Sequence, residues 1–228
     1  MPLIFAPRPL SAPLGCSRVL PLPLAVGGAV WYPGWDESVF RMLNLAGTNP
    51  ALDLVMSLFT DVALPYILIL LALPLWWRGH REQAFDLLVL LAAVIVITEV
   101  IKYAVDRARP CDVLPNVHLL TPGACVAEGD PAFPSGHSSR IFAVAAFLAV
   151  YYRWPVRVSA FLLAGMAGIS RVYLGVHWPS DVIAGAALGA GLAIVFVLAT
   201  RRWKTYLKIR TWFVDCVSRL FLGRTQRA

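Results

Sequence analysis

Long apolar runs separated by short polar segments follow one another between positions 55 and 200 of the chain. A helix that crosses the hydrocarbon core of a bilayer needs about 20 mostly apolar residues, and runs of this length are typical of membrane spans. The pattern therefore predicts an all-α, polytopic membrane helix bundle with five spans, of which the third is short and needs flanking residues. The predicted spans cover residues 55–77, 84–105, 138–152, 157–173 and 182–200.

The composition supports a membrane protein. Hydrophobic residues make up 59% of the 228 residues and charged residues only 14%, whereas soluble domains carry roughly 25% charged residues. A soluble chain of this size would lack the polar surface to hide five such helices. The length allows one domain. We expect a proline-rich N-terminal segment (1–34), a membrane domain (35–200) that starts with a surface amphipathic helix (36–46), and a basic amphipathic tail (201–228).

The formal net charge of +7 would fit a nucleic-acid-binding protein, but the positions of the basic residues argue against that class. They lie in two short loops and after the last predicted span, which puts them all on one side of a five-helix bundle. The positive-inside rule makes that side cytoplasmic, so loops 106–134 and 171–181 face outward. The basic residues are Arg78, Arg81, Arg153, Arg157, Arg201, Arg202, Lys204, Lys208 and Arg210.

Two of the four cysteines, Cys111 and Cys125, share the first outward-facing loop. Disulfides form in oxidising compartments outside the cytoplasm, so we predict that these two cysteines close the loop. The alternative is a pair of free thiols that never meet. Cys16 and Cys216 are expected to be unpaired.

Three clusters of polar residues lie at the outer ends of the predicted spans, and the first is Lys102 followed by Arg109-Pro110. Cations in membrane helices are costly and usually functional, and both side chains suit phosphate oxygens. The alternative is that Glu99 and Asp106, which flank Lys102 at helical spacing, simply neutralise it. On this cluster alone the two interpretations are equally good.

The second cluster is Pro134-Ser135-Gly136-His137, immediately before the third span. A Ser-Gly turn that opens a helix presents free backbone N–H groups to an anion. A histidine beside it is placed to protonate a leaving oxygen. The alternative is an ordinary helix cap with an interfacial histidine, which is the commoner outcome for one short tetrapeptide.

The third cluster comprises Arg171, His177 and Asp181, near the start of the last span. Asp181 follows His177 by one helical turn, so its carboxylate can keep one imidazole nitrogen protonated and leave the other free to attack. Arg171 adds a cation that stabilises charge on a transferred group. The alternative is a capped helix start with a structural His–Asp hydrogen bond. The other histidines, His80 and His118, lie in loops without an identifiable partner, and we interpret them as solvated.

In this order and spacing, the three clusters resemble the signature motifs of the type 2 phosphatidic acid phosphatase superfamily, from about residue 36 to residue 200. The resemblance implies a six-helix core, one helix more than the pattern predicts, and metal-independent hydrolysis through a phosphohistidine, without a cofactor. It implies that His177 is the nucleophile, oriented by Asp181, and that His137 is the general acid. The phosphate-binding residues that it implies are Lys102, Arg109, Ser135, Gly136 and Arg171.

Residues 40–56 are similar to the entry region of small bacterial undecaprenyl-diphosphate phosphatases, and Arg140 adds a cation that suits a diphosphate or caps a helix. We therefore expect an enzyme of the bacterial inner membrane that releases phosphate from undecaprenyl diphosphate on the periplasmic side, in support of the cell wall. Its partners would be this lipid and the surrounding membrane, not nucleic acid. The alternatives are a phosphatidylglycerophosphate, phosphatidate or lipid A phosphatase or phosphotransferase, and a phosphate-lipid transporter or binding protein. A vanadium haloperoxidase is disfavoured by the apolar spans.

Overall fold

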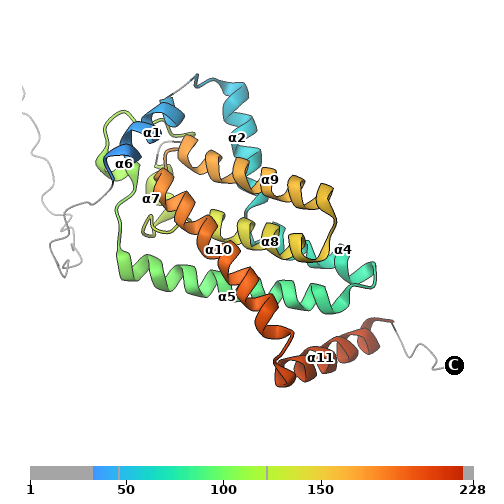
Figure 1. Cartoon of the computed structure of the whole chain (residues 1–228). Coiled ribbons are helices and arrows are strands. Elements are labelled where there is room, and N and C mark those ends of the chain that lie inside the picture. The colour runs from blue at the N-terminus through green and yellow to red at the C-terminus, as the bar shows by residue number, and fades with distance from the viewer. Residues whose placement is uncertain (1–32, 46, 122, 223–228) are drawn as a thin grey trace, which may run out of the picture.

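The computed structural model describes residues 33–45, 47–121 and 123–222, and every regular element in these ranges is an α-helix. Residues 1–32 of the expected proline-rich segment, with Cys16, lie outside the described residues. Figure 1 shows the long helices packed side by side, with short helices at one end and α11 near the other. The elements are α1 (Gly34–Leu45), α2 (Pro50–Val62), α3 (Pro65–Leu70), α4 (Ala72–Trp77), α5 (Arg81–Val105), α6 (Pro110–Val113), α7 (Ala124–Glu128), α8 (Gly136–Tyr151), α9 (Trp154–Tyr173), α10 (Pro179–Thr200) and α11 (Lys204–Leu222).

The central helix of the bundle is α8, which packs against α5, α9 and α10. It has 16 residues, so at 1.5 Å per residue it is about 24 Å long, shorter than the ~30 Å hydrocarbon core. Most of its side chains are buried by the surrounding helices. Among the described residues, three helices, α5, α9 and α10, are long and apolar enough to cross a membrane. The all-α bundle is confirmed, while the number of spans that qualify by length and composition is smaller than the five predicted.

The first predicted span, 55–77, is broken in the structure. The segments Pro50–Val62 and Pro65–Trp77 meet at 56°, and they add a fourth span only if the bent pair is counted as one. Proline lacks the N–H that continues a helix and clashes with the preceding turn, so a new helix begins at Pro65. The bend leaves the C-terminal end of α2, with Thr60, beside the functional site.

The backbones of α8 and α10 are almost in contact. A Cβ atom added at Gly185 would lie 2.6 Å from the carbonyl oxygen of Ser135, and one added at Gly189 would overlap the backbone of Ser139. Small residues let two helices approach this closely. These two glycines, one turn apart, therefore set the spacing between α10 and the N-terminal half of α8.

The expected amphipathic helix at 36–46 is present as α1, but it does not lie free on the membrane surface. It packs against α9 and α10, and its buried side chains are Asp36, Phe40 and Asn44. These residues recur every four positions and so share one face of the helix. The buried face carries two polar residues because their partners belong to the bundle.

The helix of the basic tail, α11, docks on the opposite end of the bundle, at the start of α5. The Tyr206 hydroxyl donates to Asp86 at 2.6 Å. Arg210 pairs with Asp86 at 2.9 Å and with Glu82 at 2.7 Å. The tail helix is therefore held by specific polar contacts at the end of the bundle where the two short basic loops lie.

Candidate active site

The three predicted clusters come together at one end of the bundle because neighbouring long helices run in opposite directions. Lys102 lies in the last turn of α5 and Arg171 in the last turn of α9. His137 and Asp181 lie in the first turns of α8 and α10. His177 lies in the turn that connects α9 to α10. Residues from four helices and from the turn between two of them thus reach one region.

Arg109 does not lie on the same helix as Lys102. Helix α5 stops just before Asp106, which adopts a left-handed conformation (φ 48°), and Arg109 is the N-cap of α6. The chain reverses there, and the guanidinium points into the bundle. It donates to the carbonyl oxygens of Asp130 and Val176, each at 2.9 Å. These bonds fix its orientation.

The three basic residues Lys102, Arg109 and Arg171, here called the cation cluster, are each at most 4% exposed. Asp130 pairs with Lys102 and Arg109, and Glu128 pairs with Arg171 and, at 3.6 Å, with Arg109. Although burial opposes ionisation, the partnership with Lys102 and Arg109 holds the pKa of Asp130 below its usual value. Two carboxylates cannot neutralise three cations, so the cluster keeps a net positive charge suited to phosphate oxygens.

His177 is 1% exposed and lies between the cation cluster and a carboxylate. Its Nε2 atom is 3.5 Å from Nη1 of Arg109, and its Nδ1 atom is 3.5 Å from Oδ2 of Asp181. Burial, followed by the charges of Arg109, Arg171 and Lys102, lowers the pKa of His177 well below its usual range. The ring is therefore neutral at pH 7, with a lone pair available, which is the protonation state that a nucleophile needs.

Asp181 is held chiefly by groups other than His177. Its Oδ2 accepts a hydrogen bond from the Trp178 backbone N–H at 2.9 Å, and its Oδ1 pairs with Arg107 at 2.6 Å. The 3.5 Å separation from His177 exceeds a normal hydrogen-bond length. Arg107 also pairs with Asp36 of α1 at 2.7 Å. Sequence reasoning missed both Arg107 and Asp36, although Arg107 lies inside the first cluster.

The second cluster opens α8, as predicted from its Ser-Gly turn. Ser135 is the fully buried N-cap whose hydroxyl caps the helix, and its N–H donates to the carbonyl oxygen of Asp181 at 3.0 Å. Gly136 follows as the first helical residue. His137 is partly exposed, with Nδ1 3.4 Å from Nη2 of Arg140. The phosphate-binding and general-acid roles given to this cluster stay predictions.

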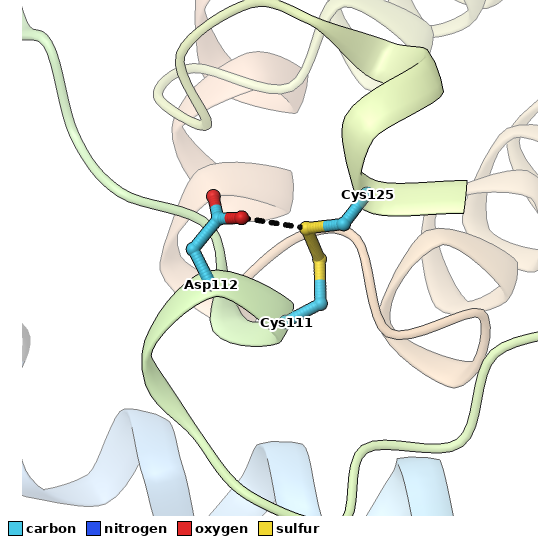
Figure 2. Close-up of side chains that lie close together, drawn as sticks. All are labelled: Cys111, Asp112 and Cys125. Atoms are coloured by element: carbon cyan, nitrogen blue, oxygen red, sulfur yellow. Dashed lines mark hydrogen bonds between the residues drawn. A yellow bond between two sulfur atoms is a disulfide. The ribbon is translucent and has the colours of Figure 1, made fainter. Parts of the chain in front are cut away.

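Cys111 and Cys125 form a disulfide that ties α6 to α7 (Figure 2), with their Cα atoms 6.0 Å apart. Oδ1 of Asp112 lies 3.2 Å from the Cys125 sulfur. The three side chains are close enough together to hold a cation, but cysteine binds metals as a thiolate, and disulfide sulfurs are not thiolates. This group is therefore a loop closure, and it anchors α7, the helix that ends at Glu128.

His118 is not solvated, contrary to our interpretation. Its Nε2 lies 2.9 Å from Asp53 of α2, and its ring meets that of Tyr173 edge-on, with centroids 5.3 Å apart. Asn44 of α1 accepts a hydrogen bond from its backbone N–H at 2.9 Å. Through these contacts His118 connects the outer loop to α1, α2 and α9. His80, at the other end of the bundle, is exposed.

Comparisons with known proteins agree with this arrangement. The sequence model of the PAP2 superfamily matches residues 83–205, more than half of the chain. An undecaprenyl-diphosphatase from Sulfolobus acidocaldarius is 29% identical over 165 residues, which cover 72% of this chain and 78% of that protein. Phosphatidylglycerophosphatase B from Bacillus subtilis is 33% identical over 169 residues, which cover 68% of this chain and 77% of that protein.

A solved structure is similar as well. The crystal structure of a transmembrane PAP2-type phosphatidylglycerolphosphate phosphatase from Bacillus subtilis matches with a TM-score of 0.60 and 27% identity, over 75% of this chain and 86% of that one. Together with the apolar helices, this likeness identifies an integral membrane protein. The resemblance inferred from the three motifs is confirmed: the chain belongs to the PAP2 superfamily and is a hydrolase.

Proposed function

We propose that this enzyme hydrolyses undecaprenyl diphosphate to undecaprenyl phosphate and phosphate through a phosphohistidine at His177. The observation that carries the proposal is the position of the His177 Nε2 atom, 3.5 Å from Arg109, beside the net positive charge of the cation cluster. A terminal phosphate whose oxygens bind the cation cluster would bring its phosphorus next to this neutral, buried nitrogen.

In the first step, the Nε2 lone pair of His177 attacks the terminal phosphorus. The bond between that phosphorus and the bridging oxygen breaks, and its electron pair leaves with undecaprenyl phosphate, to which His137 gives a proton. The cation cluster stabilises the charge on the transferred group. Asp181, on the Nδ1 side of the ring, stabilises the positive charge that the imidazole acquires.

In the second step, water attacks the phosphorus of the phosphohistidine, and the neutral His137 takes a proton from that water. The P–N bond breaks, its electron pair returns to Nε2 of His177, and inorganic phosphate is released. We expect no metal requirement, because Lys102, Arg109 and Arg171 supply the charge stabilisation that a metal ion provides elsewhere.

The substrate assignment follows the relative named undecaprenyl-diphosphatase. Phosphatidylglycerophosphate is the second candidate, because a relative and a solved structure carry that name. Both lipids offer a terminal phosphate to the same first step. We further propose a bacterial inner membrane with the site facing the periplasm, because the loop cations lie at the opposite end of the bundle, which the positive-inside rule makes cytoplasmic.

The test is phosphate release by purified protein from undecaprenyl diphosphate, phosphatidylglycerophosphate and phosphatidate, with kcat/KM measured for each. The proposal requires undecaprenyl diphosphate to be the best substrate. His177→Ala should abolish turnover and eliminate acid-labile phosphate bound to protein, whereas His80→Ala, a change to an exposed histidine at the far end, should retain both. Full phosphate release by folded His177→Ala protein would refute the mechanism. A higher kcat/KM for phosphatidylglycerophosphate would refute only the choice of substrate.

A further inference from the structure

Arg140 differs from the other buried basic residues around the site in having no carboxylate partner among the described residues. It is 9% exposed, and its nearest polar contacts are the Ala63 carbonyl oxygen and His137 Nδ1, each at 3.4 Å. A guanidinium stays charged at any physiological pH, and a buried charge without a counter-charge is costly. The basic residues that do have acidic partners are Lys102, Arg107, Arg109 and Arg171.

An apolar cleft begins next to this unpaired cation. It lies between the bend after α2, helix α8 and helix α9, and its volume is about 480 Å³. Ile141, which follows Arg140 in the sequence, lines it, and so does Val62, which precedes Ala63. The rest of the lining is apolar except for Ser159, and includes Leu68, Val144, Ala145 and Leu163. Along α8, the order is therefore histidine, guanidinium and apolar cleft.

We propose that Arg140 binds the lipid-side phosphate of a polyprenyl diphosphate and thereby makes the enzyme prefer diphosphate over monophosphate lipids. This inference rests on the proposed function. With the terminal phosphate on the cation cluster, the second phosphate lies one P–O–P bridge nearer to the hydrocarbon chain, and the first units of that chain enter the cleft. Arg140 stands between these two places and has no counter-charge of its own to release.

The chemistry of the leaving group supports the same position. When the bridging P–O bond breaks, the departing lipid phosphate gains negative charge, and a fixed cation at that point stabilises it in the transition state. A lipid with a single phosphate gives an alcohol as its leaving group, which has no phosphate oxygens for Arg140 to bind. The guanidinium should therefore matter most for diphosphates.

The experiment compares polyprenyl diphosphate with polyprenyl monophosphate of the same chain length, so that only the second phosphate differs. Arg140→Gln removes the charge and keeps a polar group near Ala63, and Arg140→Lys keeps the charge without the planar fork. The ratio of kcat/KM for diphosphate to that for monophosphate should fall at least about tenfold in Arg140→Gln, and by less in Arg140→Lys. In the matched control Arg157→Gln, on an exposed residue at the other end of α9, the ratio should hold.

An equal loss on both substrates would overturn the inference and assign Arg140 to packing between α2 and α8, while leaving the proposed function intact. If the unsubstituted enzyme released phosphate from phosphatidylglycerophosphate and none from polyprenyl diphosphate, both would fail. Should Arg140→Gln not fold, inhibition of the unsubstituted enzyme decides the matter. Methylenediphosphonate, which cannot be cleaved between its phosphorus atoms, should then inhibit at least about tenfold more tightly than inorganic phosphate, and equal inhibition would overturn the inference.

Discussion

If a phosphate binds the cation cluster as proposed, the two carboxylates that pair with its basic side chains must give way. Glu128→Gln and Asp130→Asn preserve side-chain size and remove the negative charge. A pair of unit charges about 4 Å apart is worth about 4 kcal/mol at an effective dielectric constant near 20. The two side chains are 27% and 20% exposed, however, and solvent screening at such positions reduces the value to about 1 kcal/mol for each carboxylate. The double variant should therefore bind anions more tightly by about 2 kcal/mol, or about 30-fold.

The assay is competitive inhibition by inorganic phosphate, measured together with the KM for lipid substrate. We expect both constants to fall in the double variant, and kcat to fall as well because the product phosphate leaves more slowly. Asp215→Asn, which alters an exposed acid on α11, serves as the control for loss of one negative charge. Weaker inhibition in a folded double variant would refute this reasoning, because it would mean that the acids hold the cations in place instead of competing with phosphate.

The remaining predictions concern the groups behind the site. Asp36→Asn weakens the anchor of Arg107, which pairs with Asp181, and should lower kcat about tenfold with little change in KM if Asp181 orients His177 as proposed. An equal loss in Asp36→Ala and Asp36→Asn would show that charge matters more than shape. Because the pKa of His177 is lowered, the acid limb of the pH profile of kcat/KM should lie below pH 6.5. Lys102→Gln removes one positive charge that lowers the pKa of His177, so the acid limb of the residual activity should move to higher pH. An acid limb at or above pH 6.5 in the unsubstituted enzyme would contradict the lowered pKa of His177. Replacing Cys111 and Cys125 by serine should lower Tm, since a disulfide that closes a loop of this size stabilises the folded state by about 3 kcal/mol. An unchanged Tm in thermal unfolding in detergent would contradict this prediction.

The helices that the sequence predicts well are those set by a local property. The apolar runs at 84–105 and 182–200 match α5 and α10 because the length of a run is visible without knowledge of the fold. The run at 55–77 is not one straight helix, because Pro65 interrupts it, and the hydrophobicity of the flanks hid the break. Helix α8 was recognised although it is short, but its central, buried position depends on the three helices around it.

The candidate site was likewise predictable only where a local sequence pattern marks its residues. The motif residues were identifiable from their spacing, since Asp181 follows His177 by one helical turn. Their partners were not. Lys102 pairs with Asp130, 28 residues further along the chain, and not with the neighbouring Glu99 or Asp106, which were the local candidates. No periodicity connects residues so far apart, so ion pairs across the outer loop could only come from the tertiary structure.

The contact of Gly185 and Gly189 with the backbone of α8 makes the two imidazoles part of one rigid frame. His137 lies in the first turn of α8 and His177 precedes α10, so main-chain contacts set the spacing of the two backbones that carry these side chains. A methyl group at position 189 would push α8 and α10 apart. A displacement of about 1 Å between reacting groups can cost roughly 100-fold in rate. We therefore expect changes in bilayer thickness or lateral pressure to reach the site by moving α8 and α10 together.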